Sequence, residues 1–163
     1  MEQARHVDTP MFVAPKLSCT GGDHMDSQEY RSAIGSLLYV CHTRTGIAFV
    51  VHKVSQYTQQ PCQAHWSTVK RIFHYLKGTL DYGLWIRTQS DIANLCGFID
   101  ADWGSVPDDR RSVSSHCVFL DKHLVTWSSK KQLDVSWLTA EDEYHSLVDA
   151  TSKILWVKEF LRI

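Results

Sequence analysis

The chain has 163 residues, of which 44% are hydrophobic, and its formal net charge at pH 7 is -1. This length and hydrophobic content suffice for one core or for two small packed units. A dedicated nucleic-acid-binding domain is usually basic as a whole, so the near-neutral charge excludes such a role except through local patches.

The first part of the chain predicts a connector over residues 1–26, followed by helices. Pro10, Pro15, Gly21 and Gly22 punctuate the connector, which shows no apolar period. Three helices are then expected, beginning near residues 27, 46 and 64, because apolar residues recur at spacings of three and four. Their expected inward positions are Tyr30, Ile34, Leu37, Leu38 and Cys41, then Ile47, Val50, Val51, Val54 and Tyr57, then Trp66, Val69, Ile72, Phe73 and Leu76.

After Gly78, which is well placed to end the third helix, the pattern changes to strands. Segments 82–86, 95–101, 116–120 and 124–128 are short and rich in residues that favour strands. Between the last two of these segments, Asp121-Lys122-His123 predicts a hairpin turn. A last helix is expected with Thr139 as N-cap, and its expected buried stripe comprises Tyr144, Leu147, Val148, Thr151, Ile154 and Leu155.

Cysteine usage and the N-terminal residues favour a soluble intracellular protein, cytoplasmic or nuclear. The five cysteines are odd in number and include no Cys-x-x-Cys pair, which favours a reduced compartment. No apolar run approaches the length of a membrane span, so we expect no membrane partner. Polar residues such as Glu2, Arg5 and Asp8 lie where a signal peptide needs an apolar core.

The segment Phe98-Ile99-Asp100-Ala101-Asp102-Trp103 is the strongest local feature. Apolar residues precede an acid at the end of a strand, and a second acid follows two residues later on the same face. The ordinary interpretation is a strand that ends in a solvated turn. The alternative is a carboxylate held at a sheet edge to bind Mg²⁺, and the spacing alone leaves both open.

A second acidic feature, Thr139 to Tyr144, opens the last helix. Three acids in one turn usually compensate the helix dipole. Glu143 lies at the edge of the expected stripe, from which it could reach the sheet, whereas Glu141 and Asp142 are expected to face water.

Basic residues occur in two places that could contact phosphate. Arg110 and Arg111 can bind phosphate oxygens. Because they follow the acids Asp108 and Asp109, they can instead form internal ion pairs. The polar side of the third helix carries Lys70, Arg71, His74 and Lys77, a face that is either solvated or a nucleic-acid contact. The nine histidines include no second ligand pair at zinc-site spacing, which argues against a zinc site.

Taken together, six collinear blocks resemble the Pol polyprotein of copia-type LTR retrotransposons, from the end of the polymerase into the RNase H-like domain. The blocks are Tyr30 to Tyr39, Trp66 to Thr79, Ile99 to Trp103, Asp109 to Ser112, Trp127 to Gln132 and Ala140 to Tyr144. The resemblance implies an α+β fold: a connector (1–26), a helical polymerase-connection-like segment (27–90) and a partial RNase H-like domain (91–163). The last would comprise three antiparallel strands and a helix.

The resemblance also implies a chemistry. RNase H-like domains cleave the RNA strand of an RNA–DNA hybrid with two Mg²⁺ ions held by acids. Asp100 matches the family's first-strand acid and Glu143 its first-helix acid, so both would be catalytic residues and metal ligands. The family's third catalytic Asp lies on a later strand that this chain does not include. We therefore expect the chain alone to be inactive, with residual nucleic-acid binding.

Two alternatives remain open. The chain could be an active hybrid nuclease when completed by further sequence. It could instead be a co-opted fragment that acts through protein contacts, such as a secreted pathogen effector that acts in host cells. Some copia-like sequences occur among effectors named for an Arg-x-Leu-Arg motif, which Phe160-Leu161-Arg162 does not match. Because the expected sheet has an open edge, we also expect the chain to require a protein partner, to self-associate, or to cover its sheet with its own helices.

Overall fold

The computed structural model describes residues 5–12, 17–18, 23–86, 94–106 and 108–162. The chain divides into two compact units, Met1–Gly83 and Leu84–Ile163. The first contains helices and the second contains a sheet with one helix, so the α+β class expected from the sequence is confirmed. Across the described residues, no helix is both long and apolar enough to cross a membrane.

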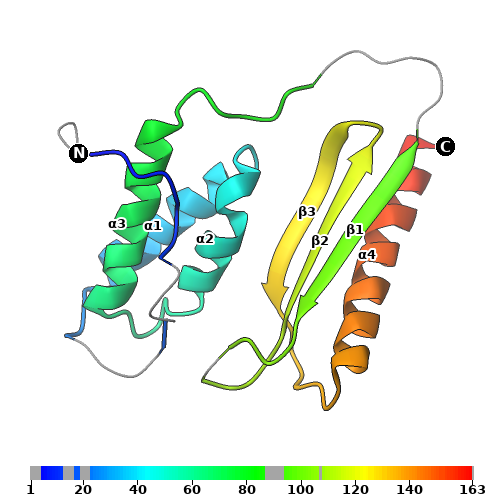
Figure 1. Ribbon diagram of the computed structural model, residues 1–163. Helices are drawn as coiled ribbons and strands as arrows, with labels where there is room; N and C mark the ends of the chain where they lie inside the picture. The colour runs from blue at the N-terminus through cyan, green and yellow to red at the C-terminus, as the bar shows by residue number, and fades with distance from the viewer. Residues whose placement is uncertain (1–4, 13–16, 19–22, 87–93, 107, 163) are drawn as a thin grey trace. The chain divides into compact units, whose positions relative to one another are not determined.

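The first unit is built from α1 (Ser27–Val40), the 3-10 helix η1 (Thr45–Ile47), α2 (Ala48–Ser55) and α3 (Gln63–Gly78), which pack together (Figure 1). Asp26 caps α1 by accepting a hydrogen bond from the Gln28 backbone N–H at 2.8 Å. The inward positions expected for the first two helices are buried, except that Leu38 is 36% exposed. The second predicted helix is shorter than expected, because its first turn is η1 and α2 ends at Ser55.

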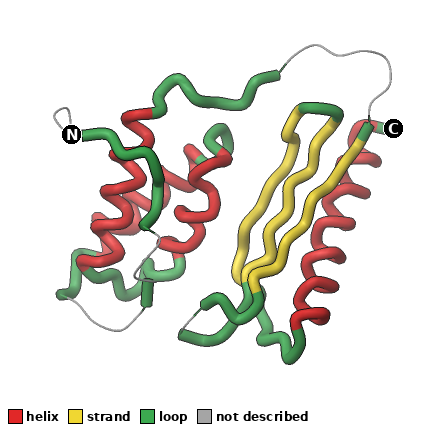
Figure 2. Tube along the Cα trace, in the orientation of Figure 1, coloured by secondary structure: helices red, strands yellow, loops and turns green. Residues whose placement is uncertain are grey.

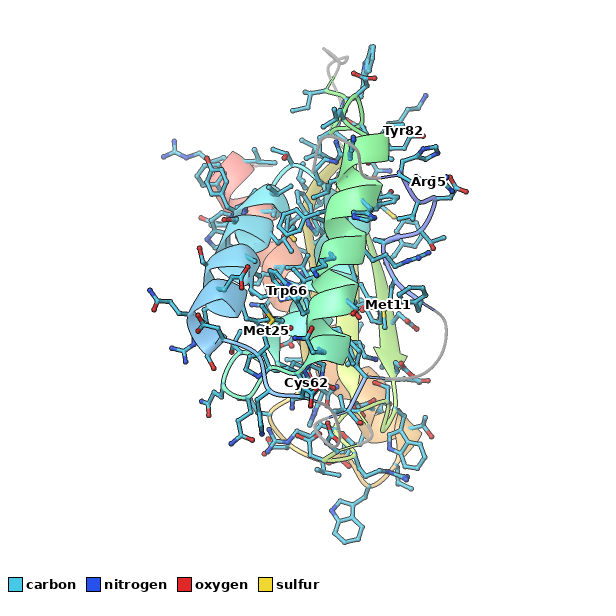
Figure 3. The ribbon with its side chains drawn as sticks, turned by 90° about the vertical axis from the view of Figure 1, so that its left-hand side faces the viewer. Arg5, Met11, Met25, Cys62, Trp66 and Tyr82 are labelled. Carbon is cyan, nitrogen blue, oxygen red and sulfur yellow. The ribbon has the colours of Figure 1, made fainter. Side chains whose placement is uncertain are left out.

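Hydrogen bonds from buried aromatic side chains tie this helical core together. The Tyr30 hydroxyl donates to the Val54 carbonyl at 2.8 Å, and the Tyr57 hydroxyl donates to the Leu17 carbonyl at 3.0 Å. The second bond anchors part of the predicted connector to the helices. Figure 3 shows Arg5 and Met11, also from this N-terminal segment, alongside α3.

The second unit contains an antiparallel sheet of β1 (Leu95–Asp102), β2 (Val113–Leu120) and β3 (His123–Lys131), in the order β1-β2-β3. The strands extend those expected from the sequence by one to three residues at their ends. The predicted hairpin between β2 and β3 is confirmed. Asp121 lies in the left-handed region at φ 55°, and its carboxylate accepts a hydrogen bond from the Asn94 backbone N–H.

Helix α4 (Thr139–Leu161) lies along one face of this sheet, against β1 and β2 (Figures 1 and 2). Gly97 permits the close approach, because a Cβ there would lie 2.5 Å from the Ile154 Cδ1 atom. Side chains that are mostly small or polar form the contact: Asp142, Ser146, Ala150 and Val157 are buried. The buried stripe predicted for this helix is therefore wrong, since Tyr144, Leu147, Val148 and Leu155 are 46–67% exposed.

Two further sequence predictions are corrected. Residues 82–86 form no strand, and the backbone carbonyls of Leu80 and Tyr82 instead accept hydrogen bonds from the Arg44 guanidinium. Thr139 is the first residue of α4, and the N-cap position is Leu138, which has no side-chain capping bond. The Glu141 carboxylate accepts a hydrogen bond from the Trp137 N–H just before the helix and so satisfies part of this terminus.

Candidate carboxylate site

Asp100 and Glu143, which the sequence places in one site, border the same pocket. The pocket has a volume of about 260 Å³ and lies where β1 meets α4. Its lining residues are Ile99, Asp100, Ala101, Glu143 and Ser146. Both carboxylates are exposed to solvent. The strand and the helix thus bring the two predicted residues to one opening in the surface.

The position of α4 over the sheet is fixed by a buried hydrogen bond. Ser146 Oγ donates to Ser114 Oγ on β2 at 2.7 Å, and both serines are buried. Ser114 pairs with Ala101 in the β1–β2 register. Glu143 precedes Ser146 by three residues, just under one helical turn, and so lies over the same end of β1.

The strand's alternation limits how Asp100 can act. Gly97 faces α4, so Ile99 and Ala101 also face α4, and the Asp100 side chain points toward the opposite face. Asp100 is still among the residues that line the pocket, although its side chain points away from α4. Within the described ranges, no group of three His, Cys, Asp or Glu residues is placed to hold a metal ion. Two carboxylates are too few to hold a pair of divalent ions.

Asp142 is the residue of this region whose environment sequence reasoning missed. It was expected to face water, but it is fully buried against the sheet. Its Oδ1 atom accepts a hydrogen bond from Ser136 Oγ at 3.2 Å, whereas Oδ2 has no partner. The sequence signal was its position four residues before Ser146, which puts both residues on one side of a helix.

The loop between β1 and β2 contains the two arginines expected to grip phosphate. Arg111 Nε lies 3.5 Å from Asp109 Oδ2, and Lys131 Nζ contacts the same oxygen at 2.9 Å. Of the two possibilities expected for Arg111, phosphate binding and an internal ion pair, the structure contains the ion pair. Burial raises the pKa of Asp109, but the Lys131 and Arg111 contacts outweigh that effect and lower it overall. Arg110 is exposed at φ 57°.

The basic residues of α3 lie in the first unit and do not form one uniform face. Arg71 donates to Thr9 Oγ1 at 2.7 Å and stacks on the Phe12 ring at 4.0 Å, so the N-terminal segment already engages it. Lys70 lies over the Trp66 ring at 5.7 Å, and the Lys77 side chain is exposed. Figure 3 labels Trp66 one turn after Cys62, the residue that caps α3.

A second pocket, with a volume of about 450 Å³, lies on the β3 side of α4. His116, His145 and Asp149 are among its lining residues. His116 is only 8% exposed, and burial lowers its pKa, with Lys153 and Lys130 acting in the same direction and Asp149 opposing them. No motif in the sequence predicts this pocket, because its residues come from β2, β3, the loop after β3 and α4.

Comparison with known proteins decides the family. The chain is 37% identical over 162 residues to the retrovirus-related Pol polyprotein from transposon RE2 of Arabidopsis thaliana, a match that covers 99% of the chain. The Pol polyprotein from transposon RE1 of the same plant matches equally well. The chain belongs to the copia-type retrotransposon Pol family. It spans 11% of the length of these two Pol polyproteins.

Another relative, which is not named as a Pol polyprotein, has nearly the same extent as the matched part of the chain. Secreted RxLR effector protein 161 of Plasmopara viticola is 39% identical over 134 residues, which are 82% of the chain and 94% of the effector. No model of a protein family matches the copia-type chain. No solved structure matches it either, so the RNase H-like assignment of residues 91–163 stays a prediction.

Proposed function

We propose that the second unit is the RNase H-like part of a copia-type Pol and binds an RNA–DNA hybrid without cleaving it. The observation that carries the proposal is the shared pocket of Asp100 and Glu143. Two carboxylates beside one pocket can hold a hydrated Mg²⁺ ion, which keeps several waters and binds through few protein ligands. Cleavage by two ions would need more carboxylates than this pocket provides.

The proposal assigns roles to four side chains. Asp100 and Glu143 would contact the hydrated cation, whose charge would attract the phosphate backbone. Arg110 would contact a phosphate directly, because it is exposed in the loop that follows the Asp100 strand. Arg111 would hold the loop in shape through Asp109 and would not face the substrate.

A binding and cleavage assay tests this function. Fluorescence anisotropy with a labelled RNA–DNA hybrid is expected to show Mg²⁺-enhanced binding that Asp100→Asn weakens. Arg110→Ala is expected to lower the slope of log affinity against log salt by about one, the loss of one phosphate contact. Asp134→Asn is the matched control, because Asp134 is an exposed acid at the other pocket. Mg²⁺-dependent cleavage that Asp100→Asn abolishes would refute the proposal.

A second candidate function is an effector that acts through protein contacts. The observation in its favour is the match over 94% of a protein named as a secreted RxLR effector. The exposed apolar side chains of α4 provide a surface that could meet a partner. A secretion assay in the source organism separates the two: untagged chain in the medium supports the effector, and its strict retention in cells supports the Pol-derived binding role.

A further inference from the structure

The pocket on the β3 side of α4 is a groove that the fold itself forms. In the strand register, His116 on β2 lies opposite Ser128 on β3, and Ser114 lies opposite Lys130. Ser114 bonds to Ser146 of α4, so these positions are on the face of the sheet that carries the helix. Helix α4 lies mainly over β1 and β2 (Figure 1). The groove is the space that remains between α4 and β3.

His116 lies at the floor of this groove and lacks a hydrogen-bond partner. Its side chain is 8% exposed, and within the part of the chain that the structure describes it makes no hydrogen bond and no ion pair. Buried polar side chains are normally hydrogen-bonded. Because the ring lines the pocket, a bound molecule can supply the partner. The pocket volume of about 450 Å³ is within the usual range for small-molecule sites.

Two side chains of opposite charge lie beside this ring. Burial is the main reason why the pKa of His116 is lowered, and Asp149 opposes the effect whereas Lys130 adds to it. Both charges are therefore near the imidazole. Both side chains are exposed, both line the pocket, and neither is in an ion pair among the described residues. One carboxylate and one ammonium are thus available to the same ligand.

Other polar groups around the pocket are engaged or lie further out. Lys131 pairs with Asp109, and the Gln132 amide donates to Ser114. Lys153 acts on the His116 ring but does not line the pocket. The remaining titratable lining residues are exposed, namely Asp134 and His145. The free groups closest to the floor are therefore the Asp149 carboxylate and the Lys130 ammonium.

This pair of charges favours a neutral ligand, because Asp149 repels an anion and Lys130 repels a cation. A neutral molecule with hydrogen-bond donors on one edge and acceptors on another can use both groups. Guanine has this pattern. Its N1–H and 2-amino group are adjacent donors for one carboxylate, and its O6 and N7 atoms are the acceptors that lysine binds. The exposed apolar side chains Leu133 and Val148, which also line the pocket, provide surface for the faces of a flat ring.

We propose that this pocket binds a guanine base, with Asp149 accepting from N1–H and the 2-amino group and Lys130 donating to O6 and N7. The base edge also gives the buried His116 ring its hydrogen-bond partner. A free guanine nucleoside and an unpaired guanine in a nucleic acid share this chemistry. The pocket involves neither Asp100 nor Glu143 and needs no divalent cation, so the proposal stands or falls separately from the proposed function.

NMR titration of the whole chain with guanosine and inosine tests the base contact, since inosine lacks only the 2-amino group. The unchanged chain is expected to bind guanosine at least about fivefold more tightly, the smallest discrimination that a good bidentate pair provides. The largest shifts are expected at the amides of Ser128, Lys130 and Asp149. Equal affinity for the two nucleosides, or shifts centred outside this pocket, would overturn the proposal.

A pair of matched variants assigns the contact to one carboxylate. Asp149→Asn is expected to bind guanosine and inosine equally, because its amide group cannot accept from both donors. Glu159→Gln is the control, since Glu159 is another exposed acid of α4 and does not line the pocket. It is expected to keep the preference for guanosine. Thermal melts by circular dichroism check that both variants fold. A preference that survives Asp149→Asn, or is lost equally in both variants, contradicts the assignment.

Single-stranded oligonucleotides identify the source of the base. Two labelled strands that differ only by guanine or inosine at one unpaired position are compared by fluorescence anisotropy, without Mg²⁺. A fivefold preference for the guanine strand supports an unpaired base of a nucleic acid as the ligand. A preference seen only with the free nucleosides supports the pocket with a small-molecule ligand. The absence of a guanine preference in both comparisons refutes the pocket's assignment, whether or not the RNA–DNA hybrid binds.

Discussion

The buried contact between Asp142 and Ser136 leads to a quantitative prediction: removing the Asp142 carboxylate should change the free energy of unfolding by little. Asp142 is fully buried, one carboxyl oxygen accepts a hydrogen bond from Ser136, and the other oxygen has no partner. A buried polar atom left unsatisfied costs about 1–3 kcal/mol, whereas a hydrogen bond contributes about 0.5–1.5 kcal/mol. Removing the whole side chain therefore eliminates a cost that is comparable to, or larger than, the bond it loses.

We expect Asp142→Ala to change the free energy of unfolding by less than about 1 kcal/mol, because the void left behind offsets part of the gain. Ser136→Ala should lower it by about 1–3 kcal/mol, because both carboxyl oxygens are then unpaired. In the Asp142→Ala background, the same serine substitution should cost much less. The double-mutant cycle should thus give a coupling energy above about 0.5 kcal/mol.

Native-state hydrogen exchange of the β2 and α4 amides is the suitable assay, since it reports the stability of the second unit alone. Urea unfolding followed by circular dichroism gives a parallel value by linear extrapolation. Should Asp142→Ala lower the unfolding free energy by more than about 2 kcal/mol, the unpaired oxygen must have a partner that stabilises the fold. The reasoning would then be wrong.

Three further predictions concern single side chains. Because burial lowers the pKa of His116 below 6.5, the unfolded chain binds a proton more readily than the folded chain. The second unit should therefore lose stability as pH falls through about 6.5. Between about pH 5.5 and 8, the melting temperature should change more with pH for the unchanged chain than for His116→Gln. Tyr30→Phe should lower the stability of the first unit by about 0.5–1.5 kcal/mol in urea unfolding, because it removes the bond to Val54, and an unchanged midpoint would contradict this. Iodoacetamide should label the exposed Cys96 well before Cys41, because burial raises the pKa of Cys41 to about 11. Mass spectrometry of the labelled peptides gives the order of labelling, and earlier labelling of Cys41 would contradict the prediction.

The helices of the first unit could be predicted well from the sequence because one period controls them. Large apolar residues at spacings of three and four, such as Tyr30, Ile34 and Leu37, have only one place to go in a small helical core. The strands β1, β2 and β3 were also found, since each is a compact run of strand-forming residues beside a turn. The segment 82–86 is also rich in strand-forming residues but forms no strand, and local pattern does not reveal pairing.

Helix α4 could not be predicted by the same rule, because its larger apolar side chains are not the ones that face the sheet. Gly97 makes room for the Ile154 side chain, and Ser146 and Ala150 are buried against the sheet, whereas Tyr144 is left exposed. For the site, the strand-end position of Asp100, the helix position of Glu143 and the family resemblance together predicted one site for the two acids. The burial of Asp142 depends on how the helix is rotated over the sheet, which no motif records.

The most direct test of the two-carboxylate site is paramagnetic broadening by Mn²⁺ in the NMR spectrum of the chain. Mn²⁺ takes oxygen ligands as Mg²⁺ does, so it should bind where the carboxylates provide them. Substoichiometric Mn²⁺ is expected to broaden amide signals around Asp100 and Glu143 first, excess Mg²⁺ should reverse the effect, and Asp100→Asn should weaken it. Broadening centred elsewhere, or broadening that Asp100→Asn leaves unchanged, would contradict a divalent-cation site at the junction of β1 and α4.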